Sequence, residues 1–282
     1  MSSSTSWVTS RNPDANNIFA IAGVVVKEMY RRKDFYVLLV LIVLITLMLG
    51  SVSFFDDDRI VRYLKDACLL LIWLSSLVIA ITTAARQIPA ERESRTIYPL
   101  LAKPVGRGEF VAGKFLGCWV ACGIALVGFY FFFGIMSASR EHTLPFLVYF
   151  QAIWLHWMCL GIVVALVLLG SVVFAAPSSN ATICFIVVLG IMFAGGHLNT
   201  LALQMRGFRG EVVYALYYAI PHLEWYDVRD FIIHNWGGSG LRLVTHNIDW
   251  LVWVGASIYA ALYTGMLLGC TWLVFQRRTM TL

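Results

Sequence analysis

Charged residues are scarce in this sequence. Asp, Glu, Lys and Arg make up 13% of its 282 residues, whereas hydrophobic residues make up 60%. A soluble domain usually carries about a quarter charged residues. A share near half of that value excludes an ordinary soluble protein.

Charge is absent altogether from six stretches of 19 or more residues. They are Phe35–Phe55, Ala67–Ala85, Phe115–Ser139, Phe146–Val173, Ala181–Leu203 and Trp250–Phe275. A helix of about 20 apolar residues crosses a bilayer core of about 30 Å. We therefore predict an all-α membrane protein with six transmembrane helices, forming one domain over residues 1–282. Residues 86–114 and 204–249 form its two longest connections.

The cysteines give no sign of a disulfide framework. Five of the six lie inside the predicted spans and Cys68 lies at the edge of one. Free cysteine behaves as a small buried hydrophobic residue. We expect that behaviour here.

The basic residues are divided unequally between the two sides of the predicted spans. With the N-terminus in the cytoplasm, the cytoplasmic side carries 13 basic and 6 acidic residues, a net charge of +7. The opposite side carries 8 basic and 10 acidic residues, a net charge of −2. Cytoplasmic segments of membrane proteins are enriched in Lys and Arg. We therefore predict that both termini are cytoplasmic.

One short stretch resembles a nucleotide-binding loop. Gly108, Gly113 and Lys114 fit the pattern G-x-x-x-x-G-K, but Phe115 stands where a Ser or Thr would bind magnesium. The motif also requires a preceding buried strand and a soluble nucleotide domain. Neither is indicated, since the residues that follow form a predicted span. We expect no ATP hydrolysis and no bound cofactor or metal in this chain.

The connection after the second predicted span contains a short charged segment, ERESRTIYPLL. Glu91 and Glu93 would suit the N-terminus of a helix over these residues, while Ile97 and Leu100 would rest on apolar surface. Its polar residues would then face an aqueous partner. The alternative is a basic loop that lies on anionic lipid and has no protein partner.

The same segment resembles a known family. ERESRTIYPLLAKPVGRGEFVAGKF is similar to the stretch after the second span in permease subunits of type-II ATP-binding-cassette (ABC) exporters. The matching residues, in order, are Glu91, Arg92, Glu93, Thr96, Leu100, Leu101, Lys103, Pro104, Val105, Arg107, Gly113 and Lys114. The departures are Ile97 for the usual Leu, and Ser94 and Arg95 where a small residue or Gly is common.

That resemblance implies a non-catalytic subunit with partners. In this family two permeases, identical or different, pair with two separate ATPase subunits, which bind ATP and Mg. The segment after span two forms a coupling helix on the ATPase and transmits its movement to the spans. The implied contact residues are Glu91, Arg92, Glu93, Arg95, Thr96, Leu100, Leu101 and Lys103. The implied location is the inner cell membrane and the implied transport is export, of a substrate that the sequence does not identify.

Two further stretches resemble parts of the same family. Val24–Leu39 is similar to its basic amphipathic helix, which lies on the membrane before the first span and here carries Lys27, Arg31, Arg32 and Lys33. Leu216–Gly238 is similar to a Pro-containing stretch before the last span in the branch of multicopper-enzyme maturation permeases.

The outer connection, residues 204–249, is too long for a simple loop. Its mixture of aromatic and charged residues favours interfacial or re-entrant helices. The predicted anchors and the proline that interrupts them are Tyr217, Tyr218, Pro221, Trp225, Tyr226 and Trp236. Histidines in the outer connections, His142, His222, His234 and His246, are too dispersed to indicate a metal site, so we expect solvated side chains.

The spans themselves indicate little about a substrate. Glycines such as Gly195 in span five and Gly117 in span three favour close helix packing over a substrate role. The spans carry no acid or base apart from the histidines His156 and His197, which argues against ion-coupled transport. Two alternatives stay open: a channel or secondary carrier without an ATPase, and an electron carrier in which the two histidines hold a haem iron.

Overall fold

The computed structural model describes residues 13–31, 58–93, 106–141, 146–204, 210–213, 221–227 and 249–277, with positions 36, 37, 40, 43, 44, 47, 217, 220 and 229. Every regular element in this part of the chain is a helix. The elements are α1 (Pro13–Tyr30), α3 (Asp58–Ala85), α4 (Gln87–Glu93), α6 (Arg107–Glu141), α7 (Phe146–Val173), α8 (Pro177–Gln204), the 3-10 helix η1 (Leu223–Tyr226) and α11 (Trp250–Arg277).

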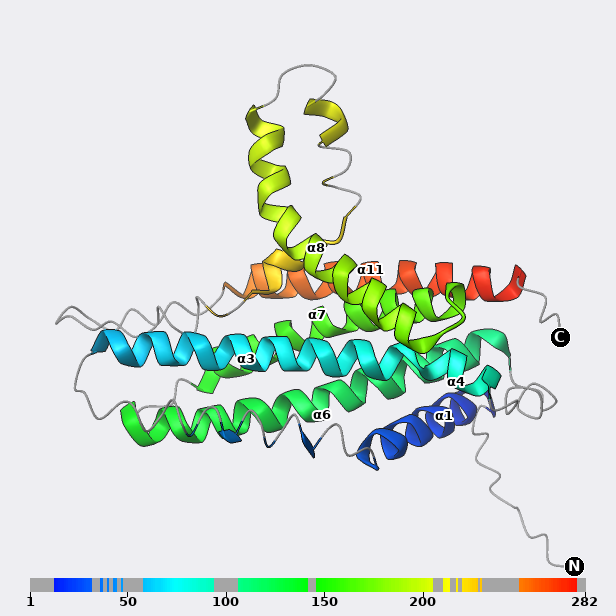
Figure 1. Ribbon diagram of the computed structural model, residues 1–282, viewed down its shortest axis with the longest axis horizontal. Coiled ribbons are helices and arrows are strands. Elements are labelled where there is room, and N and C mark those ends of the chain that lie inside the picture. Colours follow the sequence, from blue (N-terminus) through cyan, green and yellow to red (C-terminus); the bar gives the residue numbers. More distant parts are fainter. Residues whose placement is uncertain are drawn as a thin grey trace, which may run out of the picture.

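Four long helices, α3, α6, α7 and α11, run side by side as a bundle (Figure 1). Each contains a segment long and apolar enough to cross a membrane. α7 is the most deeply buried of the four and α11 the least. The sequence of α7 explains its place, because it has no charged residue and a helix that is apolar on every side is buried.

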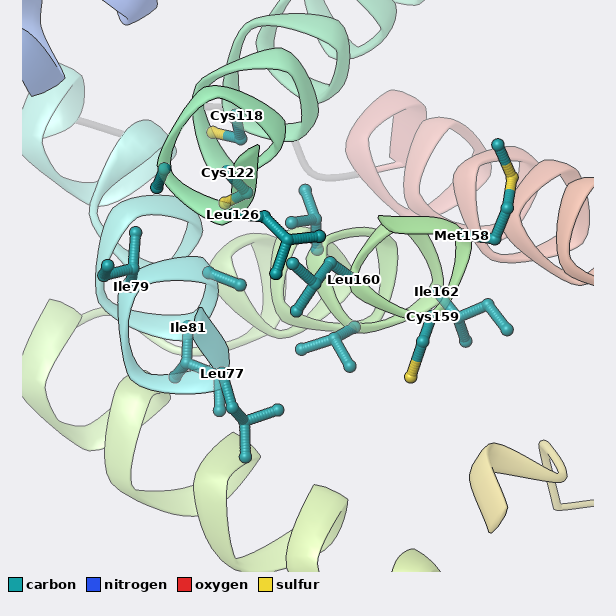
Figure 2. Close-up of a cluster of buried hydrophobic side chains, with 14 of the residues drawn as sticks. Leu77, Ile79, Ile81, Cys118, Cys122, Leu126, Met158, Cys159, Leu160 and Ile162 are labelled. Atoms are coloured by element: carbon teal, nitrogen blue, oxygen red, sulfur yellow. The ribbon is translucent and has the colours of Figure 1, made fainter. Parts of the chain in front are cut away.

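The core of the bundle lies where α3, α6 and α7 meet. Leu77 of α3, Leu126 of α6 and Leu160 of α7 are buried in one cluster, which also contains Cys122 and Cys159 (Figure 2). The predicted behaviour of the cysteines is confirmed for five of the six, which are buried and not in a disulfide. Cys270 is exposed on α11.

Two tryptophans, Trp119 and Trp157, connect α6 to α7 by reciprocal hydrogen bonds. The indole N–H of Trp119 donates to the carbonyl of Trp157 at 3.0 Å, and the indole of Trp157 donates to the carbonyl of Trp119 at 2.9 Å. The rings stack with centroids 4.3 Å apart. Each ring also lies against a glycine of the other helix. Trp157 packs against Gly123, four residues after Trp119, and Trp119 packs against Gly161, four residues after Trp157. The prediction that glycines serve close helix packing is confirmed at Gly123, whereas Gly128, Gly134 and Gly190 face open space.

The helix ends differ from the ends of the charge-free stretches. α7 coincides with its stretch, but α3 begins nine residues earlier, at Asp58, and α6 begins eight residues earlier, at Arg107. A charged residue ends the apolar part of a helix but does not interrupt its backbone hydrogen bonds. Both helices therefore extend into the polar residues before the apolar stretch. Lys114 consequently lies two turns inside α6, whereas the sequence placed it at the start of the helix.

Two of the six predicted spans are not established by the structure. Most of Phe35–Phe55 lies outside the described residues. α8 covers Ala181–Leu203, but it runs beside the bundle and then bends away from it (Figure 1). Among the described residues of α8, Pro177–Phe193 forms an apolar helix that is shorter than the four membrane-length helices. Six spans and the orientation of the termini therefore stay predictions.

The N-terminal helix starts earlier than Val24. α1 begins at Pro13 and packs along α6 with Val25 and Met29 buried. Gly117 permits this approach, since a Cβ there would lie 2.6 Å from the Val25 Cβ. Lys27 and Arg31 are exposed, while Arg32 and Lys33 lie outside the described residues.

Candidate functional site

α4 lies against one end of the bundle, together with α1 and the last turn of α11 (Figure 1). We call this the α4 end. α4 begins at Gln87, one residue after α3, and spans seven residues. The sequence placed the start of this helix at Glu91. Pro89 explains the earlier start, because proline is tolerated in the first turn of a helix. Glu91 and Glu93 thus lie near the C-terminus of α4, and the favourable interaction expected with its N-terminal dipole is absent.

Lys114 of α6 is the centre of the α4 end. Its ammonium group forms an ion pair with Oε1 of Glu91 and donates to Oε1 of Gln87 at 3.1 Å. The side chain of Lys114 is 5% exposed and that of Glu91 18%. Both partners are on α4, so one buried cation joins the short helix to the long one. Loss of one member of a buried ion pair costs about 3–5 kcal/mol.

α4 is also joined to α3 and to the apolar end of the bundle. The Gln87 amide donates to the carbonyl of Thr83 at 3.3 Å, inside the last turn of α3. Ile88 packs in a buried cluster with Phe110 of α6, Val172 of α7 and Phe275 of α11. A displacement of α4 therefore acts on α3, α6 and α7 through direct contacts.

Arg107 connects the start of α6 to the end of α11. Its guanidinium donates to the carbonyls of Phe275 at 3.3 Å and Gln276 at 3.0 Å. These carbonyls belong to the last turn of α11, where they have no partner within the helix. The rings of Phe110 and Phe275 stack beside this contact at 5.9 Å.

The segment that resembles a nucleotide-binding loop forms a regular part of α6. Residues 107–117 are helical, so their backbone N–H groups do not form a phosphate cradle. Gly113 lies against α1, since a Cβ there would be 2.9 Å from the Ile21 Cβ. Lys114 is bonded to α4. Glycine and lysine at these positions thus have packing and pairing roles.

The predicted coupling residues are only partly described. Glu91 lies in α4 and faces Lys114, while Arg92 and Glu93 complete the helix. The others, Arg95, Thr96, Leu100, Leu101 and Lys103, lie outside the described residues. Sequence reasoning missed Gln87 and the pairing of Lys114. A signal was present, because Lys114 is the one charged residue between Glu109 and Arg140, and a lone cation in an apolar helix requires a partner.

A second polar group lies inside the bundle around His156 of α7. Nε2 of its ring is 2.9 Å from Oγ of Ser76 on α3, and Nδ1 is 3.3 Å from the hydroxyl of Tyr130 on α6. Both ring nitrogens thus have hydrogen-bond partners on neighbouring helices. His197 is exposed on α8. The hydrogen bonds of His156 join three helices, and the haem alternative for the two histidines stays a sequence-based alternative.

The outer connection corrects two predictions. Tyr226 is fully buried, with its hydroxyl donating to the carbonyl of Ala256 at 2.7 Å, so it anchors η1 to α11 and does not lie at an interface. His222 is also buried, against the rings of Tyr217 and Trp225. Burial lowers the pKa of His222, although the neighbouring Glu224 opposes this. Tyr218, Trp236, His234, His246 and His142 lie outside the described residues.

Asp227 and Arg229 form an ion pair directly after η1. The guanidinium donates to both carboxylate oxygens, at 2.8 and 2.6 Å. Burial alone would raise the pKa of Asp227, but the hydrogen bonds and charge of Arg229, together with His156, lower it below its ordinary value. No group of three potential metal ligands occurs among the residues that the structure describes.

Comparison with known proteins yields one family. A family model described as ABC-2 family transporter protein matches residues 19–208, which is more than half of the chain. The match contains most of α1 and all of α3, α4, α6, α7 and α8, but not the last turn of α11 at the α4 end. No curated protein matches the chain.

Proposed function

This chain belongs to the ABC-2 family of transporter proteins, and we propose that it is the permease subunit through which a separate ATPase subunit drives transport. It is a multi-pass membrane protein, with at least four helices of membrane-spanning length and composition. The family makes it a membrane component of an ABC transporter. We further propose how movement reaches the permease, which residues contact the ATPase, and that the transport is export.

The observation that carries the proposal is the bridge from Lys114 to α4. α4 is short, lies at one end of the bundle and has its charge paired to a long helix. A partner that pushes on α4 moves Glu91 and Gln87, and the Lys114 ammonium moves with them. α6 is 35 residues long, about 52 Å of helix. Movement of its first turns is therefore carried across the whole membrane.

The direct contact with the ATPase is assigned to the residues that follow Glu91. Because Glu91 pairs with Lys114, its charge serves the connection within the chain. The predicted contact residues that follow it are Arg92, Glu93, Arg95, Thr96, Leu100, Leu101 and Lys103. In this proposal they meet the ATPase, and the Glu91–Lys114 pair passes the displacement to α6.

The finer parts of the proposal follow the sequence resemblance. Two permease subunits and two ATPase subunits form the transporter, with ATP and Mg in the ATPases. Transport is export across the inner cell membrane, both termini are cytoplasmic, and the chain has six spans. The Pro-containing stretch Leu216–Gly238 favours the branch of multicopper-enzyme maturation permeases.

The test is affinity purification of the tagged chain from its native membrane in mild detergent. We expect an ATPase subunit in the purified complex, with ATP hydrolysis that is absent from the chain purified alone. The chain alone should also fail to retain a fluorescent ATP analogue. Purification without an ATPase from native membranes, combined with transport by the chain alone in vesicles, would support the channel or carrier alternative.

A further inference from the structure

The loop around η1 penetrates the bundle. Leu223 and Tyr226 are 1% and 0% exposed and belong to the main core. Besides the bond from Tyr226 to Ala256, the backbone N–H of His222 donates to the Tyr259 hydroxyl at 3.2 Å. We call residues 221–227 the η1 loop. In Figure 1 it lies beside α11, close to the place where α8 bends away.

The η1 loop lies at membrane depth. Its contacts Ala256 and Tyr259 are six and nine residues into α11, about 9–14 Å along the helix. η1 also contacts α7, the most deeply buried helix of the bundle. Irregular backbone at this depth occurs only where protein covers it or where it lines a cavity. Residues of α7, α8 and α11 cover the η1 loop.

Glu224 is a carboxylate at this depth whose hydrogen bonds are incomplete. Its Oε1 accepts from the Tyr217 hydroxyl at 3.4 Å. Its Oε2 is buried and has no hydrogen-bond partner among the residues that the structure describes. α8 leaves room for this oxygen only because residue 195 is glycine, since a Cβ there would overlap Oε2.

The described basic side chains near Glu224, those of Arg229 and His222, do not neutralise it. The Arg229 guanidinium binds both oxygens of Asp227. His222 is close to Glu224, but burial keeps its pKa below the ordinary value, so its ring is neutral at pH 7. A buried carboxylate oxygen without a donor favours binding of a cation that brings one.

Aromatic rings surround the same place. The His222 ring lies 4.3 Å from Tyr217 and 4.7 Å from Trp225, and Trp225 lies 5.4 Å from Tyr259. The Trp225 ring is 54% exposed, so its face is accessible from outside the bundle. Indole and phenol faces attract ammonium groups, most strongly where water is excluded.

We propose that Glu224 and the face of Trp225 form a subsite for an organic ammonium group, and that the transported substrate carries such a group on an apolar body. The ammonium N–H donates to Oε2 of Glu224, and the apolar body rests on Trp225. The identification of this ligand as the substrate rests on the proposed transport function. Binding itself requires no ATPase.

The experiment measures thermal unfolding of the purified full chain in mild detergent. The probe is butylammonium, and butanol and potassium ions are the controls for its apolar and charged parts. We expect butylammonium to raise the melting temperature and both controls to have no effect. The variant Glu224→Gln should bind butylammonium at least tenfold more weakly. Glu211→Gln, an exposed glutamate in the same connection, should bind it as the wild type does.

Trp225→Leu provides an independent test, because this exposed ring can be replaced without opening the core. It should weaken butylammonium binding several-fold, and Trp225→Phe should retain it. Equal binding by the wild type, Glu224→Gln and Trp225→Leu would overturn the subsite, as would an equal effect of butanol or potassium. Butylammonium binding by a chain that co-purifies with no ATPase from its native membrane would leave the subsite intact and refute only the coupling proposal.

Discussion

Glu91 at the α4 end and Glu224 in the η1 loop are both glutamates placed against a long helix, but their surroundings differ. Glu91 meets the ammonium of Lys114, and the pair joins two helices. Glu224 meets a glycine and aromatic rings, and Oε2 of its carboxylate is left without a donor among the described residues. Because the Glu91 carboxylate is paired with Lys114, it can transmit a movement of α4 to α6. The Glu224 carboxylate has no such cation beside it among the described residues, so it can bind a cationic ligand.

The largest expected effect comes from Lys114→Met, which leaves the Glu91 carboxylate buried without its cation. We expect a loss of about 3 kcal/mol in unfolding free energy, the lower end of the range for broken buried pairs because Glu91 retains some exposure. The double variant Lys114→Met with Glu91→Gln should recover most of it. Thermal unfolding in detergent measures both, with Lys27→Met as an exposed control. A double variant as unstable as the single one would show that the pair contributes no stability.

The next largest effect is a difference between alanine variants of Glu91 and Glu93, which lie in the same helix. Glu91→Ala should destabilise the permease, whereas Glu93→Ala should leave its unfolding unchanged to within about 0.5 kcal/mol. If Glu93 contacts the ATPase, its loss removes a charge-assisted bond of about 1.5–3 kcal/mol, and the ATPase should bind tenfold or more weakly. Co-purification at increasing salt measures the binding. Unchanged binding in Glu93→Ala would remove this residue from the interface.

The glycines of the two regions should respond differently to alanine. Gly117→Ala brings a Cβ against Val25 of α1, and such overpacking costs about 1–3 kcal/mol. Gly195→Ala instead displaces the Glu224 carboxylate, so its clearest effect should be weaker butylammonium binding. Gly128 faces open space on α6, and Gly128→Ala should be neutral or slightly stabilising. A neutral Gly117→Ala would contradict the close packing of α1 on α6.

Apolar patterning predicted the bundle well but the sites poorly. The charge-free stretch Phe146–Val173 gave both ends of α7, because its flanks carry the turn residues that end the helix. α6 extends beyond its stretch, because Arg107 and Lys114 find partners on α11 and α4 that are distant in sequence. Similarly, nothing near Tyr226 indicates that its hydroxyl reaches Ala256, thirty residues away. Contacts between distant helices decided both sites.

The smallest expected effect is a pH dependence of the η1 loop. Burial lowers the pKa of His222 in the folded chain, and the neighbouring Glu224 opposes this shift. The rings of Tyr217, Trp225 and Tyr259 also face His222, but they carry no charge that would stabilise its protonated form. The unfolded loop therefore binds more protons, and folding of the loop is most favourable above the unfolded pKa of about 6.5. As the pH falls below that value, stability should decrease by at most about 1.4 kcal/mol per unit until the folded His222 is also protonated. Hydrogen exchange of the Tyr226 and Asp227 amides between pH 7.5 and 5, corrected for intrinsic rates, measures this local opening. In His222→Phe the corrected exchange should not change over that range, and an unchanged slope in this variant would assign the pH dependence to another group.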